Sequence, residues 1–485
     1  ARDKYELTGY PYLNIGSEDF QTNSGTGSEY TSNSVFGRVI YSYADRYLFQ
    51  ANVRHDGSSR FAKGYRWGTF PSFSAGWVAS EEKFMKNLKW DWLSFLKLRG
   101  SWGMLGNERI GSNYFPYIAL MSFGNSLFYM ADGSVVSDKT ARPAVLAVED
   151  ITWETTTSTD LGLDVNFLNN RLQFHFDYYW KETKDMLLNI EIPYFMGYNN
   201  PSTNAGKMST HGYDIEVAWN DQIGDFKYGV NVNFSDFLSK IDYMNDGEQI
   251  SGGKIKRAGV LFNEFYGYVC EGIYQTQEEV NNSARTSTTV TVGDLKYRDI
   301  SGPDGVPDGV ISPEYDRVPL GNSLPRFQYG GSLNASYKGI DFSLAFQGIG
   351  KQNSYLSTSM VQPLRDNYGN VPAILEGKYW SPFNTTEENL AAKYPRLSNV
   401  SKSNNYATSN FWMFNGSYFR LKNITLGYTL PKSWTQKAGI NRARFYVSGS
   451  DLFCLSNFPS GWDPEMGTSD YPITTSLVMG IQVNF

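Results

Sequence analysis

The sequence predicts an all-β protein whose antiparallel strands form a membrane-spanning barrel, and three observations lead to this fold class. Apolar and polar residues alternate along many short segments, which is the pattern of strands with two different faces. Aromatic residues make up 16% of the 485-residue chain, and they are enriched in strands. The connections alternate between very short and very long, which is typical of a transmembrane barrel and rare in a compact soluble domain.

The first predicted strands come in pairs joined by tight turns or short connections. "SVFGRVIYSY" and "YLFQANVRHD" flank a turn at Ala44 and Asp45, and "SFSAGWVA" is followed by "FLKLRGSWGM". "DLGLDVNF" and "RLQFHFDYYWK" are separated only by residues 168–170, which predicts a hairpin.

The same pattern continues to the end of the chain. "YDIEVAWN" and "FKYGVNVNFS" meet around residues 221–225, and "FQYGGSLNASY" and "IDFSLAFQ" meet at Lys338 and Gly339. The last predicted strands lie in "YFRLKNITLGYTL", "RFYVSGSDLF" and the terminal "ITTSLVMGIQVNF".

Long connections are predicted at residues 105–156, 182–210 and 350–417. If every tight turn lies on one side of the membrane, the strand directions allow about thirteen strands. "FYGYVCEGIY", residues 265–274, is therefore placed inside one large outer excursion, residues 236–326. Because bacterial barrels of one chain have an even number of strands, we expect residues 1–485 to be part of a larger barrel.

In a membrane barrel the apolar face meets lipid and the charged face lines a watery lumen. Residues on the predicted inner face could bind substrate, line the wall or contact a plug, and no single one is favoured. These residues are Lys97, Arg99, Asp160, Asp164, Asp214, Glu216 and Lys227.

Composition excludes several other classes of protein. A net charge of -6 and the absence of a Lys/Arg block argue against a nucleic-acid partner. Cys270 and Cys454 match no metal or disulfide pattern, and the three His residues form no zinc-protease motif. Carboxylate pairs such as Asp463 and Glu465 are too common to indicate a glycosidase. No catalytic residue or organic cofactor is predicted.

One glycine-rich segment, "YRDISGPDGVPDGVISPEYDR", concentrates acidic residues. Asp304, Asp308 and Asp316 are candidate calcium ligands because carboxylates on tight loops suit this ion. The spacing does not match an EF-hand loop, so a solvated acidic turn is the favoured alternative.

Seven segments, in this order, resemble the SusC/RagA-like TonB-dependent outer-membrane transporters. They are "RHDGSSRF", "WGTFPSFSAGW", "LKLRGSWGMLGN", "TTTSTDLGLD", "YYWKETKDMLL", "YFRLKNITLGYTLP" and "GWDPE". The resemblance covers essentially the whole chain. It implies a barrel of about 22 strands closed by an N-terminal plug. Residues 1–485 would be the C-terminal part of this barrel, with about thirteen strands and no plug.

The resemblance also implies a location and partners. The protein would lie in the outer membrane of a Gram-negative cell and import oligosaccharides or peptides with energy relayed by TonB, which would act through the N-terminal region. A SusD-like surface lipoprotein would cover the large extracellular loop regions, residues 236–326 and 350–417. A passive porin and an outer-membrane barrel hydrolase are the alternatives.

Roles are also predicted for the two ends of the chain and for three tryptophans in the connections. Phe485, the last residue of an alternating strand, resembles the signal that directs barrel assembly. Residues 1–33, rich in Gly, Ser and Thr, are expected to belong to an outer loop. Trp380, Trp412 and Trp462 are candidates for stacking on a sugar or for contacts with a partner, or for packing the loops together.

Overall fold

The computed structural model describes residues 27–88, 90–111, 114–245, 247–358, 361–365, 371–467 and 471–485. The expected outer loop at residues 1–33 lies mostly outside the described residues, and strand β1 (Ser32–Tyr43) begins at its end. Within the described residues, no helix is both long enough and apolar enough to span a membrane.

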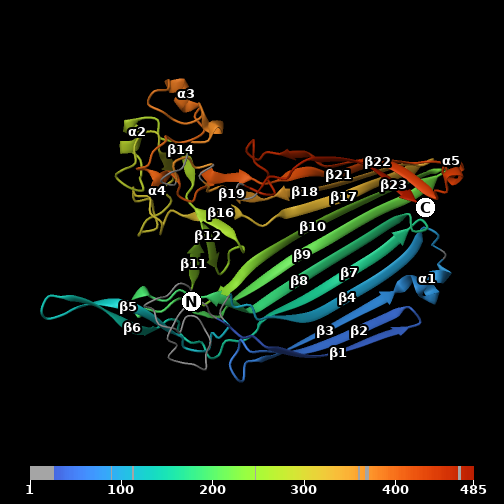
Figure 1. Ribbon diagram of the computed structural model, residues 1–485, viewed down its shortest axis with the longest axis horizontal. Coiled ribbons are helices and arrows are strands. Elements are labelled where there is room, and N and C mark those ends of the chain that lie inside the picture. Colours follow the sequence, from blue (N-terminus) through green and yellow to red (C-terminus); the bar gives the residue numbers. More distant parts are fainter. Residues whose placement is uncertain are drawn as a thin grey trace.

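Thirteen antiparallel strands form one continuous sheet, in which each strand pairs with its predecessor among the thirteen. Figure 1 shows these long strands side by side, from β1 to β23. After β1 the sheet contains β2 (Tyr47–Ser58), β3 (Trp67–Val78), β4 (Leu93–Asn107), β7 (Glu154–Phe167), β8 (Leu172–Asn189), β9 (Ser202–Ile223), β10 (Phe226–Met244), β17 (Arg326–Tyr337), β18 (Ile340–Lys351), β21 (Tyr418–Thr429), β22 (Arg442–Ser456) and β23 (Ser476–Asn484). The predicted strand number and order are confirmed.

Tight turns join strands at one end of the sheet. Ala44 and Asp45 both have φ of 54° between β1 and β2. Leu168, Asn169 and Asn170 all have positive φ between β7 and β8. Left-handed residues of this kind match the twist of the flanking strands, and Asn tolerates them best. The predicted hairpins are therefore confirmed.

The remaining helices and strands are short and lie in the connections. At the tight-turn end are η2 (Ala79–Glu81), α1 (Lys83–Asn87), α5 (Lys432–Thr435) and η6 (Gln436–Ala438). The long connections contain β5 (Met121–Tyr129), β6 (Val135–Pro143), η3 (Tyr194–Met196), β11 (Glu248–Ser251), β12 (Lys254–Arg257), β13 (Glu264–Gly267), β14 (Cys270–Ile273), α2 (Gln277–Asn281), β15 (Leu295–Tyr297), β16 (Val318–Asn322), β19 (Asn353–Tyr355), η4 (Ala373–Leu375), α3 (Thr386–Leu390), α4 (Lys402–Asn405), η5 (Asn410–Trp412) and β20 (Met413–Asn415).

These short strands form small sheets of their own. β11, β12, β13 and β16 make a four-stranded sheet, and β14 pairs with β15, β19 with β20 and β5 with β6. The segment at residues 265–274 supplies β13 and β14, so its exclusion from the large sheet is confirmed. Figure 1 shows the β5–β6 hairpin projecting away from the rest of the molecule.

Two predicted connections are longer in the sequence analysis than in the structure. β8 runs to Asn189 and β9 starts at Ser202, so the predicted connection at residues 182–210 shrinks to residues 190–201. β10 continues past Asp236, the expected start of the large excursion, to Met244. Pairing persists in these stretches although the alternation does not, because a strand that extends beyond the lipid needs no apolar face.

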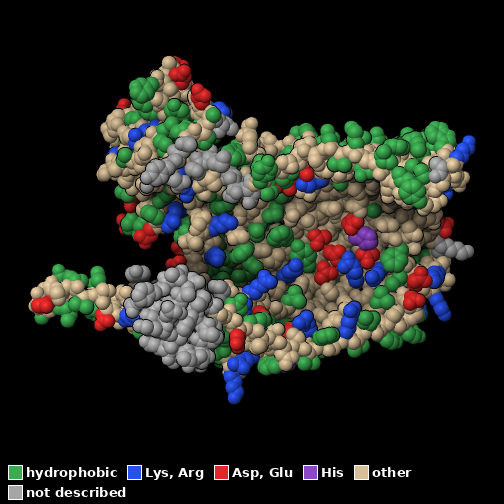
Figure 2. All heavy atoms as spheres, viewed as in Figure 1, with side chains coloured by type: hydrophobic (Ala, Val, Ile, Leu, Met, Phe, Trp, Pro, Cys, Tyr) green, Lys and Arg blue, Asp and Glu red, His purple; other side chains and the backbone are tan. Residues whose placement is uncertain are grey.

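The two faces of the large sheet differ as predicted. On β7, Leu161 is 55% exposed, and its neighbour Asp160 points to the opposite face. On β23, Met479 and Ile481 are also largely exposed. Figure 2 shows hydrophobic side chains along the outer edge of the molecule and charged ones inside its hollow. The apolar surface of the sheet therefore faces outward.

Buried apolar clusters lie at the long-connection end. Phe61, Phe70 and Trp153 form one cluster with Ile110 and Ile151. Three further clusters fill the two longest connections, residues 247–325 and 352–417, whose described parts together we call the loop lobe. The loop lobe is a packed body rather than a set of separate loops.

Candidate functional site

Arg99 of β4 is the centre of a charged cluster in the hollow of the sheet. Its guanidinium lies 3.3 Å from Asp164 of β7 and 2.5 Å from Asp177 of β8, and 3.7 Å from Asp160. It reaches across β7 because Gly162 lies beneath it; a Cβ there would be 2.4 Å from the Arg99 Cζ atom. The glycine in "DLGLD" is thus required by the arginine in "LKLRG".

Other charged groups extend this cluster along the same face. His175 Nδ1 lies 2.9 Å from Asp164, and Lys97 lies 3.9 Å from the same carboxylate. Asp214 of β9 is directly opposite Asp177 in the sheet register. Figure 2 shows acidic, basic and histidine side chains gathered in the hollow. The inner wall is therefore a charged surface suited to water and polar solutes.

The two remaining predicted inner-face residues lie nearer the tight turns, and Glu216 of β9 is directly opposite His175 in the sheet register. Glu216 accepts a hydrogen bond from the Asn231 side chain at 2.6 Å. Lys227 is at the start of β10 beside the tight turn, where it is exposed. The structure brings Lys97, Arg99, Asp160 and Asp164 together and places Asp214 beside them.

A second charged group joins β21 to the connection that follows β22. Arg420 is only 3% exposed, and its guanidinium lies 2.7 Å from Asp463 and 2.5 Å from Glu465. Lys422 lies 3.8 Å from Glu465 and 2.8 Å from Asp451. Both carboxylates of "GWDPE" are therefore held by a buried arginine, which is a structural use for this pair.

A polar cleft of about 630 Å³ opens where β8 and β9 meet the loop lobe. Arg109, Lys256 and Glu191 are its charged residues, and Asn189 and Gln249 are among its amides. Gln249 donates a hydrogen bond to the Asn189 carbonyl at 2.7 Å, which ties β11 to the end of β8. The volume falls in the range of ligand sites, so the cleft is a candidate for first contact with a solute.

Two of the three candidate tryptophans lie inside the loop lobe, and the third packs against it. Trp412 is fully buried and donates a hydrogen bond from Nε1 to the Asn405 carbonyl at 2.7 Å. Trp380 is 9% exposed and covers Gly293, and Trp462 packs against the cluster around Trp412. In this arrangement the geometry favours the packing alternative over stacking on a sugar.

A buried ionic network locks the two halves of the loop lobe together. Asp294 has no exposed surface and binds the guanidinium of Arg396 at 2.7 Å. Its carboxylate also accepts hydrogen bonds from Ser401 at 2.8 Å and Asn405 at 2.9 Å. The nearby Tyr297, fully buried, donates a hydrogen bond to the Asn404 carbonyl, and burial raises its pKa well above the ordinary value. Sequence patterns gave no sign of this network.

Among the described residues, which include the acidic segment, no group of three or more His, Cys, Asp or Glu side chains could hold a metal ion. Asp316 is fully buried and accepts hydrogen bonds from the backbone N–H groups of Ile300, Ser301 and Ser312. Asp308 accepts one from Val310 at 2.9 Å, and Asp304 is exposed. The geometry therefore gives no support to calcium at Asp304, Asp308 and Asp316, and it also differs from a fully solvated turn.

Comparison with known families agrees with this architecture. The model of the family described as "TonB dependent receptor-like, beta-barrel" matches residues 2–448. The chain belongs to the TonB-dependent receptor β-barrel family. Its predicted resemblance to SusC- and RagA-like transporters is confirmed at the level of the family and the barrel fold.

Two relatives of this TonB-dependent receptor chain come from Formosa agariphila and Bacteroides thetaiotaomicron. It is 31% identical to TonB-dependent receptor P3 of Formosa agariphila, over 93% of this chain and 45% of that protein. It is 30% identical to TonB-dependent receptor SusC of Bacteroides thetaiotaomicron, over 93% of this chain and 43% of that protein. The chain thus spans less than half the length of these relatives.

The solved structure of the RagAB peptide transporter has the same fold. Superposition covers 100% of this chain and 50% of that chain, with a TM-score of 0.76 and 25% sequence identity. A further structure of the RagAB peptide importer, in its "closed-closed" state, matches with a TM-score of 0.72.

Proposed function

We propose that this chain is the C-terminal part of the barrel of a TonB-dependent transporter, which imports oligosaccharides or peptides across the outer membrane of a Gram-negative cell. The observation that carries the proposal is the charged inner wall around Arg99, enclosed by a sheet whose outer face is apolar. Such a sheet in lipid gives a polar solute a route across the membrane.

Transport by this chain requires no covalent change to the solute. The polar cleft at Arg109, Glu191 and Lys256 would receive the solute at the long-connection end, and the inner wall would form part of its path. TonB would supply the energy through the N-terminal region implied by the family. The residues of this chain would bind and orient the solute during passage.

A SusD-like surface lipoprotein is proposed as the partner at the long-connection end. Support comes from apolar side chains that protrude there, including Phe383, 96% exposed, and Phe195, 88% exposed. On the β5–β6 hairpin, Phe123 and Tyr129 are 79% and 83% exposed. Aromatic groups of this kind form the cores of protein interfaces, and a lid over a barrel mouth should bury more than about 1,600 Å².

The passive porin and the barrel hydrolase remain as competing functions that one experiment separates. The full-length protein is expressed in its native organism, and uptake of labelled oligosaccharides and labelled peptides is measured with and without TonB. Uptake that requires TonB and delivers the solute unaltered supports the proposal. Uptake that persists without TonB indicates a porin, and cleaved solute in the medium of cells lacking other hydrolases indicates an enzyme.

The lipoprotein partner has its own test. The full-length protein is purified from its native membrane in mild detergent, and the proteins that remain bound are identified. Recovery of a surface lipoprotein in equal amount supports the lid. Recovery of the barrel alone, with uptake unchanged after deletion of neighbouring lipoprotein genes, would contradict it.

A further inference from the structure

The outer wall of the last four strands of the sheet, β18, β21, β22 and β23, carries an apolar groove of about 750 Å³. Ile340, Leu426, Tyr428, Phe445, Val447 and Met479 line it. These side chains share the outward face, because Leu426 is opposite Val447 and Tyr428 is opposite both Ile340 and Phe445 in the register. Each is at least 38% exposed in this chain, so nothing within the described residues covers the groove.

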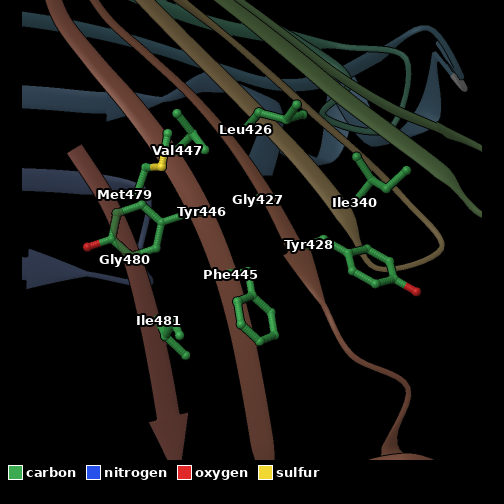
Figure 3. Close-up of a pocket in the computed structure, with 10 residues that line it drawn as sticks. All are labelled: Ile340, Leu426, Gly427, Tyr428, Phe445, Tyr446, Val447, Met479, Gly480 and Ile481. Carbon is green, nitrogen blue, oxygen red and sulfur yellow. The ribbon is translucent and has the colours of Figure 1, made fainter. Parts of the chain in front are cut away.

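The groove has an aromatic end and an aliphatic end. Figure 3 shows Tyr428 and Phe445 on the side from which β21 continues toward α5, with Leu426, Val447 and Met479 farther along the strands. Figure 1 shows that α5, α1 and the C-terminus lie at the same end of the sheet, where the tight turns are. Aromatic rings at an interface and aliphatic groups beyond them are the arrangement that barrels present to a lipid leaflet.

Basic residues stand at the aromatic end of this groove. Lys338, in the turn that precedes Ile340, places its Nζ 5.3 Å from the centre of the Tyr337 ring. Lys432 begins α5, four residues after Tyr428. The two segments are joined, since Thr429 donates a backbone hydrogen bond to Gly339 at 2.7 Å. Among the described residues, neither lysine forms an ion pair with a carboxylate.

We infer that this groove is a binding site for one anionic glycerophospholipid of the periplasmic leaflet. An acyl chain would lie along Leu426, Val447 and Met479, and Lys338 and Lys432 would bind the headgroup phosphate. The inference rests on the proposed function in one respect, namely the placement of the tight turns on the periplasmic side. Two unpaired lysines beside an apolar groove match an anionic headgroup joined to a hydrocarbon chain.

The location distinguishes this lipid from other occupants. A lipid of the outer leaflet would have its headgroup at the long-connection end. The aliphatic end of the groove points that way, and the two lysines are at the opposite end. A second copy of the chain or another protein would have to cover the apolar groove and leave the lysines to water. The phospholipid satisfies both the groove and the two cations.

The test uses the full-length protein in nanodiscs of equal parts phosphatidylglycerol and phosphatidylethanolamine with identical acyl chains, followed by native mass spectrometry. We expect one phosphatidylglycerol to be retained preferentially. The double variant Lys338→Glu with Lys432→Glu should lower its retention about 30-fold, at about fivefold for each lysine. Lys83→Glu, an exposed lysine of α1 at the same end but away from the groove, should leave retention unchanged.

A third variant, Leu426→Trp, fills the groove without changing charge and should lower retention of both lipids. Its folding is checked by heat-dependent gel mobility, and the lysine variants, which change exposed residues only, decide the question if it does not fold. Equal retention of the two lipids, or equal loss with Lys83→Glu, would overturn the inference. TonB-dependent uptake measured on the same variants separates this result from the proposed function, because wild-type uptake without selective lipid retention rejects only the lipid site.

Discussion

Replacing Leu161 by Arg tests which face of the sheet meets lipid. Leu161 is 55% exposed on the outer face of β7. Val165 is on the same face but only 7% exposed, with Leu96 of β4 and Phe174 of β8 directly opposite it in the sheet register. At about 3.3 Å per residue and a tilt of about 40°, the strand from Leu168 raises Leu161 about 18 Å above the turn. Counted from the turn, this height is about 5 Å past the middle of an apolar band about 25 Å tall, so Leu161 lies well inside the band.

An arginine near the bilayer midplane costs about 2–4 kcal/mol in a transmembrane barrel. The folding equilibrium should therefore fall about 30- to 700-fold. Ser101→Arg is the matched control, because Ser101 is opposite Asp160 while Gly100 is opposite Leu161. The same side chain then enters the charged hollow at the same height, where we expect a cost below about 1 kcal/mol.

The assay is urea unfolding of the full-length protein in phospholipid vesicles, followed by tryptophan fluorescence and by heat-dependent gel mobility. Leu161→Arg should shift the midpoint to lower urea, and Ser101→Arg should leave it nearly in place. Equal shifts for the two variants would refute the assignment of the apolar face to lipid.

Four further predictions concern other parts of the chain. Arg420→Leu should cost about 3–5 kcal/mol because Asp463 loses its cation and Glu465 keeps only the more distant Lys422; faster hydrogen exchange at residues 457–467 would reveal it. Burial raises the pKa of the Cys270 thiol to about 11, so at pH 7.5 iodoacetamide should modify it far more slowly than in the urea-unfolded protein; equal rates would contradict this. Deleting Phe485, which is 86% exposed, should lower the amount of protein assembled in the outer membrane, and normal levels would exclude a role in assembly. Adding calcium should leave the Tm unchanged, because carboxylates of the acidic segment already accept hydrogen bonds from backbone N–H groups. A rise of several degrees would instead indicate that the segment binds calcium.

The large sheet could be predicted because alternation reports a strand with two different faces. "DLGLDVNF" and "RLQFHFDYYWK" became β7 and β8, paired in the register that their turn requires. At β8 and β9 the alternation of apolar and polar residues covers less of the chain than the strands do. Glu182 still pairs with Ser209, in a stretch where both faces of the sheet meet water. Sequence patterns thus marked the part of each strand in lipid rather than its full length.

The loop lobe was beyond the reach of sequence patterns for a different reason. Its strands are three to five residues long, and several have partners that are distant in the chain, as with Glu264 and Asn322 or Asn353 and Asn415. Such short segments carry no measurable period. The residue type of Trp412 likewise does not show whether its ring binds a ligand or fills a core. The structure places the ring in the core.

The candidate site was predicted in part. The alternation along β4 and β7 placed the charged residues Lys97, Arg99, Asp160 and Asp164 on the inner face. In the structure ion pairs link these four side chains. The polar cleft was not predicted, because its residues come from several connections that meet only in three dimensions.

The network around Asp294 has a practical consequence for engineering this surface. A foreign epitope inserted in the exposed α3 segment, between Phe383 and Leu390, would leave the anchored scaffold beneath it intact. The same insertion beside Asp294 or Arg396 would separate two stretches of chain that are about a hundred residues apart and held by one carboxylate. The α3 segment is therefore the better of the two places for an insertion that must leave the packed loop lobe intact.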